Sequence, residues 1–317
     1  MGQGMSSPSK VPVTVIGGYL GSGKTTLVNQ LLRHANGLRL AVLVNEFGAL
    51  PIDADLIESS DENVINIAGG CVCCSYGSDL IAALLDLQQV QPQPDHVLIE
   101  ASGVALPDAI AQSVTLIIRY TIDGIIVLAD SETIRNQGQD RYLADTIKHQ
   151  LDAADIILLN KVDLPEPASL NETRQWLASE DADGHVIETE NAAVPLPMVL
   201  GGHLNRITKE IAYQTKHEIP HTEHNAMVIF IDQPVDPETV AQQLSDPKLD
   251  LIRTKGFVCG LDGQTYAVQT VGRRRTISVA PHSPTDTGKI VCIRYRYPID
   301  QQAISEVIAN CKKIPLP

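Results

Sequence analysis

Short apolar runs and amphipathic segments alternate along the chain up to about residue 205. Runs rich in valine, isoleucine and leucine recur at 11–16, 40–44, 64–67, 97–99, 125–128 and 156–159. Between them, apolar residues recur three or four positions apart, the spacing of one helical face, for example at 25–34, 79–90 and 140–153. Buried strands that alternate with helices indicate a parallel sheet covered on both faces. The pattern therefore predicts an α/β domain with a mainly parallel sheet.

Beyond residue 205 the order of elements changes. The stretch 216–225 is polar, contains Pro220 and carries His217, His221 and His224, a composition typical of a linker. Solvated loop histidines are one interpretation of this trio, and metal capture is the other. Strand-like runs then follow one another, with two helical patterns among them, at 227–231, 237–244, 249–259, 265–271, 276–280, 290–297 and 301–311. Strands in succession favour an antiparallel sheet and predict a small α+β domain.

These patterns divide the chain into four parts. We expect a flexible tail at 1–10, a first domain at 11–205, a linker at 206–225 and a C-terminal domain at 226–317. A length of 317 residues agrees with two domains, since one domain comprises roughly 100–200 residues.

Composition and charge exclude several classes of protein. The chain has 24 Lys+Arg against 38 Asp+Glu, and its net charge of −14 repels a phosphate backbone. No window approaches the roughly 20 apolar residues of a membrane span, and the first ten residues lack the apolar core of a signal peptide. We therefore expect a cytoplasmic protein that binds neither nucleic acid nor a membrane.

A phosphate-loop sequence joins the first expected strand to the first expected helix. Residues 18–25 read Gly-Tyr-Leu-Gly-Ser-Gly-Lys-Thr and fit the pattern G-x-x-x-x-G-K-[ST]. Glycines let backbone N–H groups converge on phosphate oxygens, and the helix directs its positive end at the same anion. We expect Lys24 to reach the β- and γ-phosphates and Thr25 to bind Mg²⁺. The predicted nucleotide ligands are Gly18, Gly21, Ser22, Gly23, Lys24, Thr25 and, by analogy with similar loops, Thr26. A glycine-rich turn that binds nothing is the alternative.

A second motif, Asn160-Lys161-Val162-Asp163, directly follows the expected strand at 156–159. These side chains leave the sheet at its carboxyl end, where ligands of open α/β sheets bind. An aspartate there can accept hydrogen bonds from guanine N1–H and the exocyclic amine, which adenine does not present in that geometry. The motif therefore predicts GTP rather than ATP, with Asn160, Lys161 and Asp163 at the base. A strand-to-loop turn with a solvated lysine is the alternative.

Two acidic residues follow other expected strands. Glu100 comes directly after 97–99, where an acid can hold Mg²⁺ through water, and Gly103 would let the backbone approach a γ-phosphate. Glu46, in the sequence Asn-Glu-Phe-Gly at 45–48, follows the strand at 40–44, where a mobile loop could sense the γ-phosphate. For Glu100 the alternative is a helix N-cap region, and for Glu46 a plain turn. The catalytic candidates are Lys24, Glu100 and Glu46.

Three of the six cysteines, Cys71, Cys73 and Cys74, lie within four residues. Six cysteines are too few for a disulfide scaffold, and a cluster in a reducing compartment indicates a metal or redox site. Three thiolates can occupy three corners of a tetrahedron around Zn²⁺ or a similar ion, leaving one position for another residue, water or a receiving protein. The alternatives are buried inert thiols, a Cys73–Cys74 redox switch, and a structural zinc site completed by a distant ligand. Cys259, Cys292 and Cys311 are isolated, which indicates packing residues.

Together these residues resemble the CobW-type metallochaperone GTPases, which are related to the urease and hydrogenase nickel-insertion GTPases. The resemblance covers nearly the whole chain and rests on the segments 17–26, 45–48, 70–74, 100–103 and 160–163. In the second domain, Lys255-Gly256-Phe257 is similar to a segment of the family's C-terminal domain. The resemblance implies GTP hydrolysis coupled to delivery of Zn²⁺, or Co²⁺ in some branches, to a client metalloprotein. It implies Cys71, Cys73 and Cys74 as the carrier.

The resulting hypothesis is a metal-binding GTPase in which the phosphate loop and Mg²⁺ stabilise charge on the transferring phosphoryl group. No glutamine that would orient the attacking water can be identified from the sequence, so we expect slow intrinsic turnover that a client could accelerate. Two other function classes stay open: a zinc sensor or buffer with a regulatory nucleotide site, and a small-molecule kinase, which the guanine motif disfavours. The sequence also leaves a homodimer open.

Overall fold

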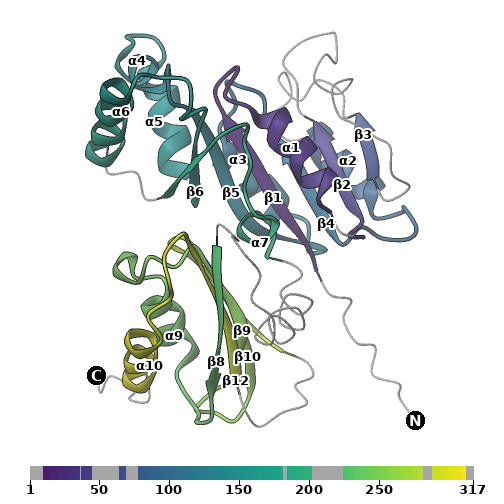
Figure 1. Ribbon diagram of the computed structural model, residues 1–317. Helices are drawn as coiled ribbons and strands as arrows, with labels where there is room; N and C mark the ends of the chain where they lie inside the picture. The colour runs from purple at the N-terminus through teal and green to yellow at the C-terminus, as the bar shows by residue number, and fades with distance from the viewer. Residues whose placement is uncertain are drawn as a thin grey trace. The chain divides into compact units, whose positions relative to one another are not determined.

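The computed structural model describes residues 10–35, 37–44, 64–68, 78–180, 184–201, 224–280 and 288–311 (Figure 1). The described chain forms two compact units, one that holds residues 10–201 and one that holds residues 224–311. Each has its own sheet. The expected linker 206–225 lies mostly outside the described residues, and its last two residues belong to the first strand of the second unit.

The first unit is built on a seven-stranded sheet in the order β3-β2-β4-β1-β5-β6-β7. Every neighbouring pair of strands in it is parallel. The strands are β1 (Val11–Gly18), β2 (Leu40–Val44), β3 (Val64–Ala68), β4 (His96–Glu100), β5 (Tyr120–Asp130), β6 (Ile156–Asn160) and β7 (His185–Thr189). The predicted parallel α/β fold is confirmed. The edge strand β7 was not predicted, because Val186 is exposed and the strand lacks a continuous apolar run.

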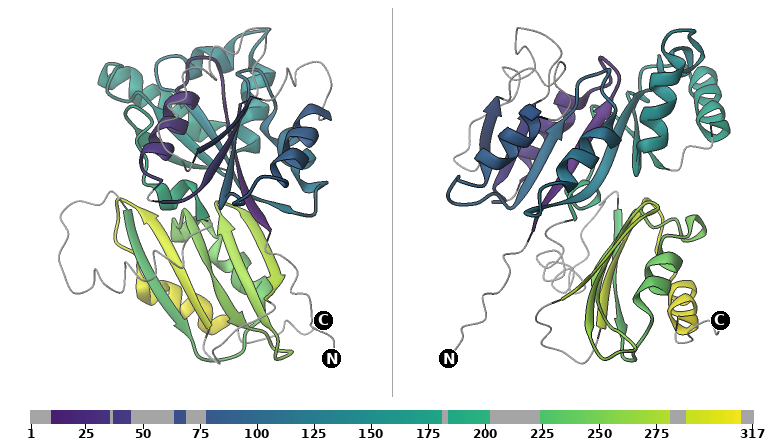
Figure 2. Two further views of the ribbon diagram at one scale, coloured as in Figure 1. Left: turned by 90° about the vertical axis from the view of Figure 1, so that its right-hand side faces the viewer. Right: turned by 180° about the vertical axis from the view of Figure 1, so that it is seen from behind.

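Helices connect the strands and cover the sheet (Figures 1 and 2). They are α1 (Lys24–Arg33), α2 (Ser78–Leu87), α3 (Pro107–Thr115), α4 (Ile134–Gln139), α5 (Ala144–Ala153), α6 (Pro167–Ser179) and α7 (Leu196–Val199). Leu84 of α2, Val114 of α3 and Leu151 of α5 share one apolar core with alternate residues of β1, β4 and β5. From β1 to β2 the chain moves along the sheet in the direction opposite to that of the connections through α2, α3 and α5. A right-handed crossover therefore places α1 on the face of the sheet opposite to those helices.

One predicted helix begins later than expected. The sequence predicts a helix over 140–153, but α5 begins only at Ala144, and the short helix α4 before it, which ends at Gln139, was not predicted. The reason is Asp140, whose carboxylate accepts hydrogen bonds from the backbone N–H groups of Tyr142 and Leu143. An aspartate that binds nearby backbone groups in this way competes with the helix and favours a turn.

The second unit is a five-stranded antiparallel sheet in the order β11-β10-β9-β12-β8, with two helices on the same face (Figure 2). Its elements are β8 (His224–Ile231), α9 (Pro237–Leu244), the 3₁₀ helix η3 (Pro247–Leu249), β9 (Arg253–Cys259), β10 (Thr265–Val271), β11 (Arg274–Val279), β12 (Gly288–Tyr295) and α10 (Gln301–Asn310). Val240, Leu244 and Ile304 from the helices pack on Val258 and Ile290 of the sheet. The predicted α+β domain is confirmed, although the strand expected from 249 begins only at Arg253, because the Asp246 carboxylate caps η3.

The parallel sheet determines where functional side chains can collect. Parallel strands leave the sheet at the same edge, and Gly18, Glu100, Asp130 and Asn160 are the last residues of four adjacent strands. Among the helices in the described ranges, none combines the length and the apolar character that a membrane span requires.

Candidate functional site

The phosphate loop lies between β1 and α1, as the motif predicts. Gly18 and Gly23 have positive φ angles of 126° and 105°, which favour glycine. A Cβ at Gly18 would lie 2.3 Å from the Leu128 carbonyl oxygen, and one at Gly23 would lie 2.5 Å from Asn160 Nδ2. The loop conformation and the approach of β5 and the Asn160 side chain therefore both require glycine at these positions.

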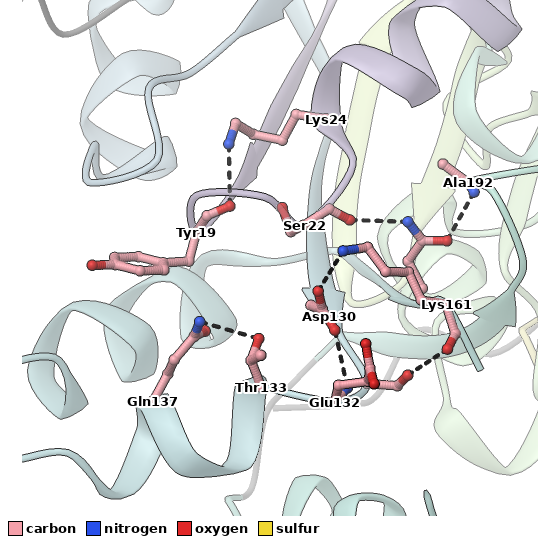
Figure 3. Close-up of polar contacts among 11 residues, drawn as sticks. Tyr19, Ser22, Lys24, Asp130, Glu132, Thr133, Gln137, Lys161 and Ala192 are labelled. Carbon is pink, nitrogen blue, oxygen red and sulfur yellow. Dashed lines mark hydrogen bonds and ion pairs between the residues drawn. The ribbon is translucent and has the colours of Figure 1, made fainter. Parts of the chain in front are cut away.

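Lys24 directs its ammonium back into this loop. Its Nζ donates hydrogen bonds to the carbonyl oxygens of Gly18 at 3.0 Å and Tyr19 at 3.2 Å (Figure 3). The lysine is buried, with 7% of its surface exposed. Ser22 Oγ is also buried and has no hydrogen-bond partner among the described residues. A buried cation and a buried hydroxyl within one loop suit a bound anion with several oxygens, since phosphate accepts hydrogen bonds from both.

Thr25 and Glu100 meet beside the loop. Ile16 of β1 pairs with Glu100 at the end of β4, and Thr25 Oγ1 donates to Glu100 Oε1 at 2.7 Å. Glu100 is 2% exposed. Burying a carboxylate is unfavourable unless it is paired or coordinates a cation, and hydroxyl and carboxylate oxygens are the ligands that Mg²⁺ prefers. The structure thus brings together the two side chains that the sequence assigns to Mg²⁺, and their chemistry fits that ion.

The segment after Glu100 packs directly on the phosphate loop. A Cβ at Gly103 would lie 2.5 Å from Leu20 Cδ2 and 2.8 Å from the Leu20 backbone nitrogen. The buried Gln150 of α5 also donates through Nε2 to the carbonyl oxygens of Gly103 at 3.1 Å and Ala105 at 2.9 Å. Gly103 is therefore required for close packing on Leu20, a reason that the sequence analysis did not give.

The second motif contacts the phosphate loop through Asn160. Its Nδ2 donates to the Ser22 carbonyl at 2.9 Å, and its Oδ1 accepts from the Ala192 backbone N–H at 2.8 Å (Figure 3). Both ends of this buried amide are thus used to join the phosphate loop to the segment after β7. Asp163 is exposed and makes no hydrogen bond to another described residue, so its carboxylate is accessible to a base. Thr26 is exposed on the first turn of α1.

Three residues of this site were missed by the sequence analysis. Asp130 ends β5, Ser131 follows it, and both contact Lys161, whereas Ala192 contacts Asn160. The strand at β5 extends two residues beyond the expected end at Leu128, so the signal for Asp130 was its place at a strand end of the same sheet. Ala192 acts through its backbone, and its positive φ of 53° is not encoded by its residue type.

Several predicted site residues lie outside the described residues. They are Glu46 after β2, Cys71, Cys73 and Cys74 between β3 and α2, and His217 and His221 of the expected linker. Within the described ranges, no three or more histidine, cysteine or acidic residues form a group that could hold a metal ion.

The three isolated cysteines are free thiols in the second unit. Cys292 and Cys311 are fully buried in its apolar core. Burial raises the pKa of the Cys292 thiol to about 12, and burial together with the Asp236 charge raises that of Cys311 to about 11. Because the thiolate is the form that binds metal, these two residues favour packing over ligation at neutral pH.

Comparison with known proteins identifies the family. Residues 12–188 match the family model described as "CobW/HypB/UreG, nucleotide-binding domain", which is more than half of the chain. The chain belongs to the CobW/HypB/UreG family. Residues 225–312, in the antiparallel-sheet unit, match the "Cobalamin synthesis protein cobW C-terminal domain". The family membership confirms the phosphate-loop GTPase predicted from the sequence.

Individual relatives align along most of the chain. The protein named "Zinc chaperone CobW" of Sinorhizobium sp is 28% identical over 310 residues, which covers 85% of this chain and 87% of the relative. "Zinc chaperone YjiA" of Escherichia coli is 30% identical over 285 residues and covers 84% of this chain and 87% of the relative. Among solved structures, zinc-bound YjiA GTPase from E. coli is 22% identical, with 96% of this chain and 100% of that chain covered and a TM-score of 0.46.

Proposed function

We propose that this protein is a GTP-hydrolysing metallochaperone that binds Zn²⁺ through Cys71, Cys73 and Cys74 and delivers it to a client metalloprotein. The observation that carries the proposal is the alignment of both units with proteins named zinc chaperones, in a chain that has three cysteines within four residues. The geometry of the phosphate loop supports the nucleotide part, and the donor chemistry of the cysteines supports the zinc part.

The phosphate end of the site would act mainly through electrostatics. Lys24 and the N–H groups at the start of α1 would stabilise the negative charge on the β- and γ-phosphate oxygens. Thr25 and Glu100, whose oxygens lie 2.7 Å apart, would hold Mg²⁺, which supplies further positive charge when it is bound. Glu46 follows β2 in the sequence and is proposed to respond to the γ-phosphate. The sequence identifies no glutamine that would orient the attacking water, so we expect slow turnover.

The base end of the site would select guanine. Asp163 is exposed next to the buried Asn160, and its two carboxylate oxygens could accept the guanine N1–H and the exocyclic amine. Asn160 itself would stabilise the site, because its amide nitrogen binds Ser22 of the phosphate loop and its amide oxygen binds the Ala192 backbone. This division supports GTP, with Asp163 as the residue that discriminates it from ATP.

The thiol motif is proposed to carry the metal as cargo. The chain leaves β3 at Ala68, on the edge of the sheet where β1 and β4 also end, and Cys71 follows three residues later in the sequence. Three thiolates leave one of the four positions around Zn²⁺ open, which suits exchange with a receiving protein better than a closed structural site does. Co²⁺ fits the same donors and is the second candidate metal.

The test is zinc stoichiometry in the full-length protein, measured against a competing chelator. The parent should bind one tight Zn²⁺ per chain, and the variant with Cys71, Cys73 and Cys74 all replaced by Ser should lose it. Cys259→Ser is the matched control, since Cys259 is a partly exposed thiol outside the motif, and it should bind as the parent does. Parent-like affinity in the triple variant would remove the carrier role. Binding that never changes with the bound nucleotide would instead favour a zinc buffer with a regulatory nucleotide site.

A further inference from the structure

Asp130 lies at the base end of the proposed nucleotide site, although no recognised motif contains it. It is the last residue of β5 and pairs directly with Asn160, the last residue of the adjacent strand β6. Its Oδ2 lies 2.6 Å from the Nζ of Lys161, the second residue of the guanine motif (Figure 3). The carboxylate of one strand end therefore binds the lysine of the next.

The ion pair is shielded and its carboxylate is fixed at both oxygens. The side chains of Asp130 and Lys161 are 11% and 31% exposed. While Oδ2 binds the lysine, Oδ1 accepts the backbone N–H of Glu132 at 3.0 Å and so closes the turn after β5. An ion pair that is partly removed from water interacts more strongly than an exposed one. Because both carboxylate oxygens of Asp130 are bound, its side chain has one fixed orientation, and this determines where the Lys161 ammonium lies.

Lys161 has an unusual backbone conformation, which the same strand end supports. Its φ is +64°, a left-handed value that is uncommon for a residue with a side chain. The buried Ser131 donates its Oγ to the Lys161 carbonyl at 2.8 Å and its N–H to the Asn160 carbonyl at 3.0 Å. Asp130 and Ser131 thus hold the side chain and the backbone of Lys161 at the same time.

We propose that Asp130 is a positioning residue of the guanine site. It draws the Lys161 ammonium toward the end of β5, and this fixes the alkyl chain of Lys161 and the 160–163 loop in the conformation that receives the base. The inference rests on the proposed function, in which Asp163 reads guanine. The two aspartates then have separate roles: Asp163 determines which base binds, whereas Asp130 determines how well the loop is organised before any base binds.

This division gives Asp130 a kinetic signature of its own. Loss of preorganisation weakens the binding of the substrate and of the transition state by the same amount, so it raises KM and leaves kcat unchanged. Asp130→Asn should raise the Kd for GDP and for a non-hydrolysable GTP analogue by the same factor, about tenfold, since a charge-assisted contact is lost. The GDP/ADP preference should stay at the parent value, because Asp163 is intact. Asp163→Asn should instead reduce that preference.

A double-mutant cycle tests whether Asp130 acts through Lys161. Calorimetric Kd values for GDP should be measured for the parent, Asp130→Asn, Lys161→Met and the double variant. The effect of Asp130→Asn should largely disappear once Lys161 is Met. Glu172→Gln is the control, because it removes an exposed ion pair with Arg135 in the same unit, and it should keep the parent Kd. Should Asp130→Asn fail to fold, Ser131→Ala removes a separate contact to the Lys161 carbonyl and should raise the Kd without changing kcat.

The results distinguish this inference from the function on which it rests. If the parent binds GDP no better than ADP, the guanine site itself is wrong. If the parent prefers GDP but Asp130→Asn keeps the parent Kd, the role of Asp130 alone is wrong. An undiminished loss in the Lys161→Met background, or a fall in kcat at constant KM, would likewise overturn it.

Discussion

The parallel and the antiparallel sheet differ in what their buried polar side chains contact. At the carboxyl end of the parallel sheet, the buried Glu100 and Asn160 contact the segment that follows another strand, β1, and the buried Lys24 binds carbonyl oxygens of that same segment. In the antiparallel sheet, the buried Thr254 and Thr270 bind each other across β9 and β10, with their hydroxyl oxygens 2.8 Å apart. Parallel connections return the chain to one edge and collect several loops there, whereas hairpins send successive loops to opposite edges.

The difference indicates where chemistry can be built in this protein. The first sheet gathers the cationic group of Lys24 at the start of α1, the carboxylate at the end of β4 and the amide at the end of β6, all at the carboxyl end of its strands. The described part of the second sheet provides a packed apolar core that also takes in the thiols of Cys292 and Cys311. Substitutions at the first edge should therefore change nucleotide chemistry, and substitutions in the second core should change stability alone.

The largest effect is expected from Lys24→Ala. This change removes the buried ammonium of the phosphate loop, and loss of one preorganised electrostatic contact lowers turnover by roughly a hundredfold or more. Phosphate release from GTP should fall below detection while the circular dichroism spectrum stays that of the parent. Lys148→Ala, an exposed lysine on α5, is the control and should keep parent turnover. Turnover unchanged in Lys24→Ala would remove the phosphate loop from the mechanism.

A smaller effect is expected at the base end. The parent should bind GTP at least about tenfold more tightly than ATP, a difference of about 1.4 kcal/mol. Asp163→Asn should erase most of this preference, because an amide cannot accept both guanine donors. Calorimetry with GDP and ADP measures the ratio without hydrolysis. Equal affinities of the parent for both nucleotides would contradict the guanine assignment and reopen the kinase alternative.

The smallest effect is expected in the second sheet and concerns pH. Burial raises the pKa of Cys292 to about 12, so above pH 9 its thiol ionises in the unfolded chain but not in the folded one. The unfolded state then binds fewer protons, and stability falls as pH rises. Between pH 9 and 10 this group should contribute a loss of about 1 kcal/mol in the free energy of unfolding.

The check is urea unfolding at pH 9 and pH 10, compared between the parent and Cys292→Ala. The variant should lose less stability over this interval, although its absolute stability is lower because a cavity is left. Its affinity for GTP and for Zn²⁺ should equal that of the parent. If Cys292→Ala weakens zinc binding, then the second sheet takes part in the metal site and the two sheets do not have separate roles.

The features that the sequence predicted are mostly those that depend on residues close together along the chain. The strand, loop and helix around Lys24 are local, and their apolar pattern and glycines predicted them. Thr25 and Glu100 are 75 positions apart, yet the sequence assigned both to one Mg²⁺ site, because each follows a strand of one parallel sheet. Because parallel strands end on the same side of a sheet, two local sequence patterns together predicted that Thr25 and Glu100 belong to one site.

The missed features lack such a local signal. Asp130 was outside the expected strand, and its pairing with Lys161 depends on the register of β5 against β6. The edge strand β7 is half exposed, and the contact of Ala192 with Asn160 uses only a backbone N–H. Asp140 delays the start of the predicted helix through hydrogen bonds of its own side chain, which compete with a pattern that is otherwise helical. Glu46 and the cysteine motif lie outside the described residues and remain predictions.

We propose that GTP hydrolysis controls metal retention, and one titration tests this coupling most directly. Zn²⁺ is titrated, with a competing chelator, into full-length protein saturated with a non-hydrolysable GTP analogue and separately with GDP, at constant free Mg²⁺ and pH. Coupling between sites typically amounts to about 1–3 kcal/mol, so zinc affinity should differ roughly 5–150-fold between the two states. Reciprocity requires zinc to shift the ratio of analogue to GDP affinity by the same factor. Indistinguishable zinc affinities in the two states would contradict the claim.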